Sequence, residues 1–263
     1  MTRDAGMATV AGAHAVVNGL PLYYEIHGQG RPLVLLPGGI LTTGLTFGPV
    51  IGPLAAGHQV IGVEPQGHGH TPDIDREMSM DQLADDVAAL LRHLGIDQAD
   101  VAGFSLGGMI ALDLAIRHPA VVGNLVLISV PYRADGFHPE TRPEQVATSG
   151  SARLPTEAER DVWEAEYRRV APDPDHWLAL QERVGPLVND FEGWSAGDMR
   201  SIGARTLILA GDTDFVRLEH AIEMFQLIPG AQLAVLPGCL HMDMTRRPEQ
   251  VLAIVGPFLD AAG

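Results

Sequence analysis

The chain has a single cysteine, Cys239, so no internal disulfide can form, and we expect a reducing compartment. No stretch approaches the roughly 18 to 20 consecutive apolar residues that a membrane-spanning helix needs. The first 17 residues hold one arginine, Asp4 and His14 but no continuous apolar segment, so we predict no signal peptide. These absences together predict a soluble, cytoplasmic protein with no membrane partner.

Basic residues are also scarce. The chain has 17 Lys and Arg against 33 Asp and Glu, which gives a formal net charge of −16. Such a chain repels nucleic-acid phosphates, and no basic cluster offsets the repulsion, so we expect no nucleic-acid partner. The hydrophobic content of 46% and the charged content of 19% suit a packed globular protein. A small-molecule partner fits this composition, and a homodimer is left open.

Short apolar runs recur along the chain. The alternation on both sides of Asn18-Gly19 predicts a β-hairpin with a two-residue turn. Continuous apolar runs are typical of strands that are covered on both faces of a parallel sheet. We predict such strands within residues 32–39, 58–64, 99–105, 124–130, 205–211 and 231–238.

Helical patterns lie between these runs, within residues 79–95, 107–119 and 248–261. In the first, Ser79 and Gln82 predict a capping box, and Gly95 predicts the C-terminal end. In the last, Pro248 suits the first helical position, and we expect Pro257 to disturb the end. Strands that alternate with helices predict an α/β fold with a mostly parallel, doubly wound sheet.

Residues 131–201 break this alternation. They form a charged, helical segment interrupted by prolines, and they include all three tryptophans of the chain. We therefore predict a core domain made of residues 1–130 and 202–263, with residues 131–201 as a helical cap insertion over the edge of the sheet.

The stretch "GFSLGG" places Ser105 between Gly103 and Gly107. A buried strand pattern precedes the serine and a helical pattern follows it. A serine at such a strand-to-helix turn is typical of a nucleophile elbow, in which flanking glycines let the strand and the helix approach closely. The alternative is a glycine-rich loop with a structural serine.

These features resemble the α/β-hydrolase superfamily over most of the sequence: the early hairpin, "LLPGG", "EPQGHGHT", the elbow, the insertion and a late acid and histidine. The turn at residues 64–71 departs from the family, with Glu64, Gln66 and Thr71 where Asp, Arg and Ser are common. The resemblance implies an α/β-hydrolase fold with a helical cap, and a serine nucleophile at Ser105.

A serine hydroxyl needs a neighbouring base to remove its proton. By resemblance, that base is His241, although Leu240 stands where the family usually has glycine. His68 and His70 compete for the role. We expect these two histidines to stabilise the glycine-rich turn instead. We predict no metal there, because neither a nearby cysteine nor a convincing carboxylate is available as a third ligand.

The base in turn needs a carboxylate that orients it. The family places this acid three residues past a glycine, which selects Asp214 after Gly211, with Asp212 as the alternative. An oxyanion also needs two backbone donors. We expect one from the N–H of Leu106. By resemblance the other comes from Gly39, with Ile40 as the alternative.

The predicted activity is that of a carboxylesterase-like serine hydrolase without cofactors. We expect a small to medium, largely uncharged ester, thioester or lactone, cleaved through an acyl-enzyme. The same scaffold leaves open a cofactor-free haloperoxidase or perhydrolase, a C–C bond hydrolase, and a non-catalytic ligand-binding relative. Candidate pocket walls are the aromatic residues of the insertion and those near the elbow: Phe47, Phe104, Trp163, Tyr167, Trp177 and Trp194.

Overall fold

The computed structural model describes residues 12–141 and 150–261. Its centre is an eight-stranded sheet in the order β1-β2-β4-β3-β5-β6-β7-β8. β2 pairs antiparallel with β1 and with β4, whereas every other neighbouring pair is parallel. The predicted α/β fold with a mostly parallel sheet is confirmed. The strands are β1 Ala13–Val17, β2 Leu20–His27, β3 Arg31–Leu36, β4 His58–Glu64, β5 Ala99–Phe104, β6 Val122–Ile128, β7 Arg205–Gly211 and β8 Gln232–Leu236.

The hairpin prediction is also confirmed. Asn18 and Gly19 both have positive φ angles, 49° and 82°, and they join β1 to β2. Two successive left-handed residues form the type of turn whose twist matches that of the flanking strands. The paired ribbon extends the parallel sheet at one edge.

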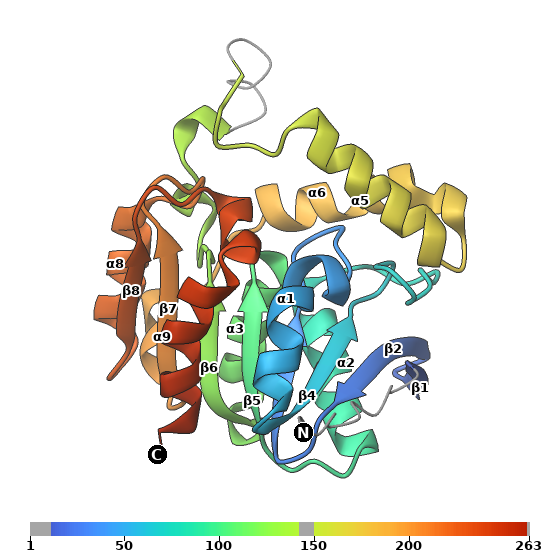
Figure 1. Cartoon of the computed structure of the whole chain (residues 1–263), viewed down its shortest axis with the longest axis horizontal. Coiled ribbons are helices and arrows are strands. Elements are labelled where there is room, and N and C mark those ends of the chain that lie inside the picture. Colours follow the sequence, from blue (N-terminus) through green and yellow to red (C-terminus); the bar gives the residue numbers. More distant parts are fainter. Residues whose placement is uncertain (1–11, 142–149, 262–263) are drawn as a thin grey trace, which may run out of the picture.

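Helices cover both faces of the sheet (Figure 1). α1 (Thr43–Ala55) contacts α9 (Pro248–Asp260), and both lie in front of the sheet in this view. α2 (Met80–His93) packs against α3 (Leu106–Arg117) behind it. α8 (Leu218–Leu227) contacts β7 and β8. Because helices cover both faces, a ligand site in such a sheet usually forms from the loops at the carboxyl ends of the parallel strands.

The start of α2 differs from its prediction. Ser79 occupies the cap position but makes no capping hydrogen bond, because its hydroxyl donates to the Asp81 carboxylate. The amide of Gln82 donates to Asp86 instead of reaching back to the cap. The predicted capping box is therefore wrong, because nearby carboxylates attract both side chains. The predicted end is confirmed: Gly95 has a φ of 70°, and Ile96 N–H donates to Leu91 O at 2.9 Å.

In the described helices, internal prolines do not end the helix. We expected Pro257 to disturb the end of α9, but the helix continues three residues past this proline. α1, which we did not predict, contains Pro49 and Pro53. The residue before a proline is disfavoured in helical conformation partly because its Cβ meets the proline ring, and glycine has no Cβ. Each of these prolines, and Pro186 of α6 (Trp177–Asn189), follows a glycine: Gly48, Gly52, Gly185 and Gly256.

Between β6 and β7 the described chain forms 3-10 turns and three α-helices: α5 Glu157–Val170, α6 Trp177–Asn189 and α7 Ala196–Ser201. α5 and α6 lie above the carboxyl ends of the strands (Figure 1). α7 contacts α3 and α8 instead. Residues 142–149 of the predicted cap lie outside the described residues, and the division into core and cap remains a prediction.

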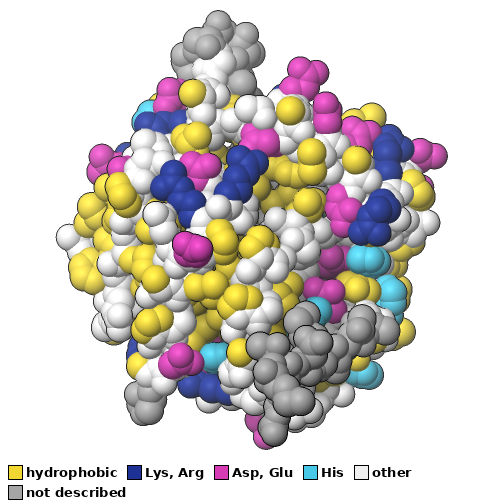
Figure 2. Space-filling view, viewed as in Figure 1, with side chains coloured by type: hydrophobic (Ala, Val, Ile, Leu, Met, Phe, Trp, Pro, Cys, Tyr) yellow, Lys and Arg dark blue, Asp and Glu magenta, His cyan; other side chains and the backbone are white. Residues whose placement is uncertain are grey.

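The surface is chemically mixed. Figure 2 shows, on one face of the molecule, basic side chains in small separate groups, most with acidic side chains nearby. Among the described residues, no helix is both long and apolar enough to span a bilayer.

Candidate active site

Ser105 lies between β5 and α3 with a strained backbone. Its φ is 53° and its ψ is −120°, a conformation that residues other than glycine rarely adopt. Ser105 N–H donates to Ile128 O at 2.9 Å, and Ser105 O accepts from Met109 N–H at 3.0 Å. The strand before the serine, the neighbouring strand β6 and the helix after it therefore all fix its position.

The glycines around Ser105 are required by close backbone contacts. A Cβ added to Gly103 would overlap Gly107 O, and one added to Gly107 would overlap Leu36 O. A Cβ on Gly108 would collide with the Val130 side chain. The predicted reason for Gly103 and Gly107, close approach of strand and helix, is therefore confirmed.

The structure joins His241 to Asp214. Nδ1 of His241 lies 2.8 Å from Oδ1 of Asp214, and both side chains are buried. Val216 N–H donates to the same oxygen at 3.1 Å. Burial by itself would raise the pKa of Asp214, but the charge and hydrogen bond of His241 outweigh it and lower that pKa below its usual range. Asp212 instead accepts Cys239 N–H at 3.3 Å, so it holds the loop before His241 and does not contact the imidazole through a hydrogen bond.

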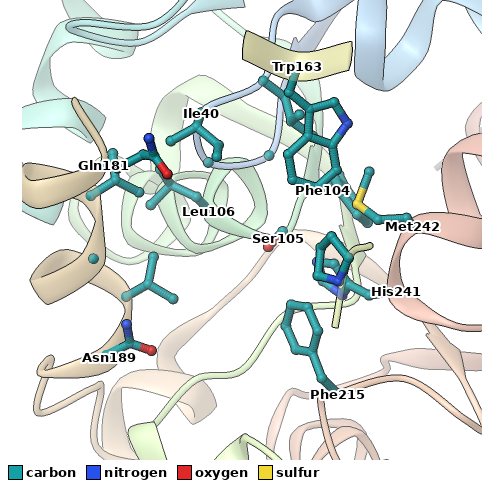
Figure 3. Close-up of a pocket in the computed structure, with 17 residues that line it drawn as sticks. Ile40, Phe104, Ser105, Leu106, Trp163, Gln181, Asn189, Phe215, His241 and Met242 are labelled. Carbon is teal, nitrogen blue, oxygen red and sulfur yellow. The ribbon is translucent and has the colours of Figure 1, made fainter. Parts of the chain in front are cut away.

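Ser105 and His241 line the same cavity (Figure 3). No hydrogen bond joins Ser105 Oγ to the imidazole in the part of the chain that the structure describes. Catalytic contacts of this kind are often long in a free enzyme and shorten when substrate binds. The geometry thus brings the predicted nucleophile and base to one site, with the acid behind the base.

The loop after β3 borders the serine from the other side. Ile40 has a φ of 61°, a strained value for a β-branched residue, and Leu41 N–H donates to Gly38 O at 3.1 Å. A Cβ on Gly39 would lie 3.6 Å from the Leu106 Cβ, so this loop adjoins the start of α3. The first N–H groups of a helix have no partner within it and are available to an oxyanion. Leu106, with Gly39 or Ile40, remains the predicted donor pair.

The cavity has a volume of about 300 Å³, and none of its described lining residues is Lys, Arg, Asp or Glu. Figure 3 shows Phe215 and His241 on one side of Ser105, with Gln181 and Asn189 on the other. The lining residues come from the strand-end loops, from α5 and from α6: Gly38, Gly39, Ile40, Leu41, Phe104, Ser105, Leu106, Pro155, Trp163, Gln181, Val184, Gly185, Val188, Asn189, Phe215, His241 and Met242.

Of the six predicted pocket walls, only Phe104 and Trp163 line this cavity. Tyr167 and Trp177 are buried against each other, with ring centroids 5.3 Å apart. Trp194 donates its indole N–H to Asp113 of α3 at 2.7 Å, and it does not line the cavity. The prediction was wrong for these three and for Phe47, a buried core residue of α1. Phe47, Tyr167 and Trp177 pack the interior instead, and Trp194 lies outside the helices and is partly buried.

Sequence reasoning missed the contribution of α6. Its cavity-facing residues recur at helical spacing, at positions 181, 184, 185, 188 and 189. That spacing was a usable signal, because it marks one face of a helix that carries two valines, a glycine and two amides. Phe215, next to the acid, was missed because a loop residue shows no periodicity.

His68 and His70 stay within the turn at residues 64–71. Nδ1 of His68 lies 2.9 Å from Gln66 O, and burial lowers the pKa of this histidine. Nδ1 of His70 lies 2.9 Å from the Glu64 carboxylate, whose hydrogen bond raises the pKa of His70. Neither histidine lines the cavity, and no cluster of metal-ligating side chains occurs in residues 12–141 or 150–261.

The unusual residues of this turn are structural. Glu64 accepts Thr43 N–H at 3.0 Å at the start of α1. Gln66, where the family often has arginine, accepts from the guanidinium of Arg76, which also pairs with Asp86 at 2.7 Å. A nearby arginine thus supplies the positive charge that the turn itself lacks.

Comparison with known proteins places this geometry in a family. The family model for the alpha/beta hydrolase fold matches residues 31–176, more than half of the chain. RutD of Rhizobium rhizogenes, provisionally named a carbamate hydrolase, is 27% identical over 91% of this chain and 98% of its own. The 2-hydroxymuconate semialdehyde hydrolase of Pseudomonas putida is 28% identical over 89% of each chain.

A solved structure extends the likeness to three dimensions. Est816, described as an N-acyl homoserine lactone degrading enzyme, superposes with a TM-score of 0.76 at 26% identity, over 93% of this chain and 99% of its own. RutD and the Pseudomonas putida protein are both named as hydrolases, and all three relatives match nearly the full length of the fold described above. The chain belongs to the α/β-hydrolase fold family and is a hydrolase.

Proposed function

We propose that this hydrolase cleaves a small to medium, uncharged ester, thioester or lactone through an acyl-enzyme on Ser105. The observation that carries the proposal is the pairing of a strained Ser105 with the buried His241–Asp214 couple at one uncharged cavity. A serine becomes nucleophilic when a base accepts its proton, and the base needs an oriented carboxylate partner.

In the first half of the reaction, His241 accepts the Ser105 proton while Oγ attacks the carbonyl carbon. The tetrahedral intermediate places its negative oxygen toward the N–H groups of Leu106 and of Gly39 or Ile40. When the carbon–oxygen or carbon–sulfur bond breaks, His241 gives its proton to the departing alcohol or thiol. Asp214 stays ionised and stabilises the transient imidazolium, which fits the lowered pKa of this carboxyl.

In the second half, water replaces the leaving group. His241 takes a proton from the water as its oxygen attacks the ester carbonyl of Ser105. Collapse of the second intermediate releases the acid and returns the proton to Ser105 Oγ. For a lactone, both products of ring opening are one molecule, a hydroxy acid.

The cavity supports an uncharged substrate. Burying an unpaired carboxylate is costly, and the described lining offers no Lys or Arg to pair with one. Most of the lining is apolar, which suits an acyl chain or ring. The lactone named for Est816 is a substrate of this kind, whereas we expect acids such as succinate monoesters to react poorly.

The direct test is a hydrolysis panel. We expect p-nitrophenyl acetate, butyrate and hexanoate and simple lactones to turn over, and Ser105→Ala to abolish turnover. Labelling by a fluorophosphonate should reach one equivalent and map to Ser105. Turnover that persists in Ser105→Ala would contradict the proposal.

Two other outcomes of these assays would favour a different function. Absence of both turnover and labelling in the folded wild-type protein would favour a ligand-binding role. Acyl transfer to hydrogen peroxide in clear preference to water would favour a perhydrolase on the same three residues.

A further inference from the structure

The imidazole of His241 packs against two phenyl rings. The Phe215 ring is stacked on it, with centroids 3.6 Å apart and planes 25° apart. The Phe104 ring lies at 4.7 Å and 36°. Phe215 and His241 stand together beside the cavity in Figure 3. The histidine is only 3% exposed, so these two rings shield much of it from water.

One hydrogen bond does not define the orientation of an imidazole. The bond from His241 Nδ1 to Asp214 fixes one edge of the ring, but the ring can still tilt about that contact. Stacking on a face restricts this tilt, because tilting would separate the two planes or make them collide. The hydrogen bond and the stacked ring together fix the direction in which Nε2 points.

Phe215 itself is held firmly. Phe215 O accepts His138 N–H at 2.6 Å, and Val216 forms an antiparallel bridge with Phe137. The next residue, Val216, donates its N–H to the Asp214 carboxylate at 3.1 Å. The acid and the stacked ring are thus adjacent in the chain, and the segment after β6 anchors the loop that carries both.

We propose that Phe215 is a positioning residue for His241, which keeps the imidazole aimed at Ser105 during proton transfer. The inference rests on the proposed function of Ser105 and His241. Phe215 would thus affect the rate of the chemical step in addition to forming part of the cavity wall. A residue that only lines the wall would act selectively on substrates large enough to reach it.

The test uses Phe215→Leu, which removes the ring, and Phe215→Tyr, which keeps it. Phe191→Leu is the matched control, because the Phe191 ring is likewise partly buried against an aromatic ring, that of Trp194 at 5.8 Å, but neither lines the cavity nor stacks on His241. Each variant is assayed for kcat and KM with p-nitrophenyl acetate and hexanoate, and for the rate of fluorophosphonate labelling of Ser105. Thermal unfolding verifies that each variant is folded.

Phe215→Leu should lower kcat about three- to tenfold for both esters alike, and should slow labelling by a similar factor. KM should change little, Phe215→Tyr should restore most of the rate, and Phe191→Leu should leave it unchanged. If Phe215→Leu does not fold, Phe215→Met makes the same test. A change confined to hexanoate or to KM, or a Phe215→Leu rate equal to wild type, would overturn the inference. Failure of the proposed function looks different, because the wild-type protein itself would then show no Ser105-dependent turnover.

Discussion

The two sides of the cavity are built differently. On the core side, the loops after β3 and β5 are in direct backbone contact, so that a single added Cβ at Gly103 or Gly107 would overlap a carbonyl oxygen. On the opposite side, α5 and α6 contribute mainly side chains, such as Trp163 and Val188, and backbone only at Gly185. The core side therefore fixes the reacting groups and tolerates little change, whereas the helical side sets the shape of the space and can vary.

Among the variants that test this contrast between the two sides, Asp214→Asn on the core side should have the largest effect. We expect its kcat to fall about 10⁴-fold. Asparagine fits the same space but cannot stabilise an imidazolium, and its amide favours the wrong imidazole tautomer. Asp212→Asn is the matched control, because Asn can still accept Cys239 N–H. We expect that variant to stay within about threefold of wild type. Ester hydrolysis under saturating conditions measures both, and the reverse ranking would reassign the acid.

Gly107→Ala tests the packing of the core side. The new methyl group would overlap Leu36 O, so we expect a loss of about 4 kcal/mol or more in the free energy of unfolding, or failure to fold. Gly44→Ala in α1 is the control, since its Cβ would approach nothing closer than Thr42 Oγ1 at 3.8 Å. That variant should gain about 0.4 to 1 kcal/mol. Urea unfolding measures both; equal stabilities would refute the contrast between locked and open glycines.

His220 of α8 packs against Tyr132, at the start of the segment that leads from β6 to the helical side, and it predicts a pH effect. Its buried ring accepts Tyr132 N–H at 3.0 Å, and burial lowers its pKa to about 4. The unfolded chain binds a proton on this residue near pH 6.5, but the folded protein does so only near pH 4. The free energy of unfolding should therefore fall as the pH drops through that window, by about 3 kcal/mol in all.

The variant His220→Gln can keep the hydrogen bond from Tyr132 but has no proton to gain. Its unfolding free energy should change less with pH between 6.5 and 4 than that of the wild type. Asp214 acts at lower pH, because a carboxyl with a lowered pKa loses its stabilising effect only as the pH falls through that pKa. Parallel slopes for wild type and His220→Gln would show that His220 is not the responsible group.

The sequence predicted the core side better than the helical side, and for a physical reason. Buried strands and the "GFSLGG" turn obey local steric rules that leave a pattern in neighbouring residues. The pairing of Asp214, rather than Asp212, with His241 needed coordinates, because both carboxylates follow the same strand. From the sequence, the choice of Asp214 over Asp212 rested on family resemblance alone.

Other features could not be predicted because distant contacts decide them. Tyr167 lies one helical turn after Trp163 on α5, and Trp177 begins α6, so only the docking of the two helices determines which ring faces the cavity. Phe215 stacks on a histidine that lies beyond the next strand in the sequence. The two prolines of α1 argued against a helix in the sequence. The structure shows that the helix continues through both prolines, each of which follows a glycine.

The smallest predicted effect tests whether the helical side controls substrate size. Val188 faces the cavity from α6, whereas Val162 on α5 is 57% exposed. Val188→Phe should fill part of the space, so that kcat/KM for hexanoate falls about tenfold relative to acetate. Val162→Phe adds the same ring at the solvent side of the same pair of helices and should leave that ratio unchanged. A uniform loss for both esters in Val188→Phe would instead mean that α6 also affects the reacting groups, and the separation between a fixed core side and an adjustable helical side would fail.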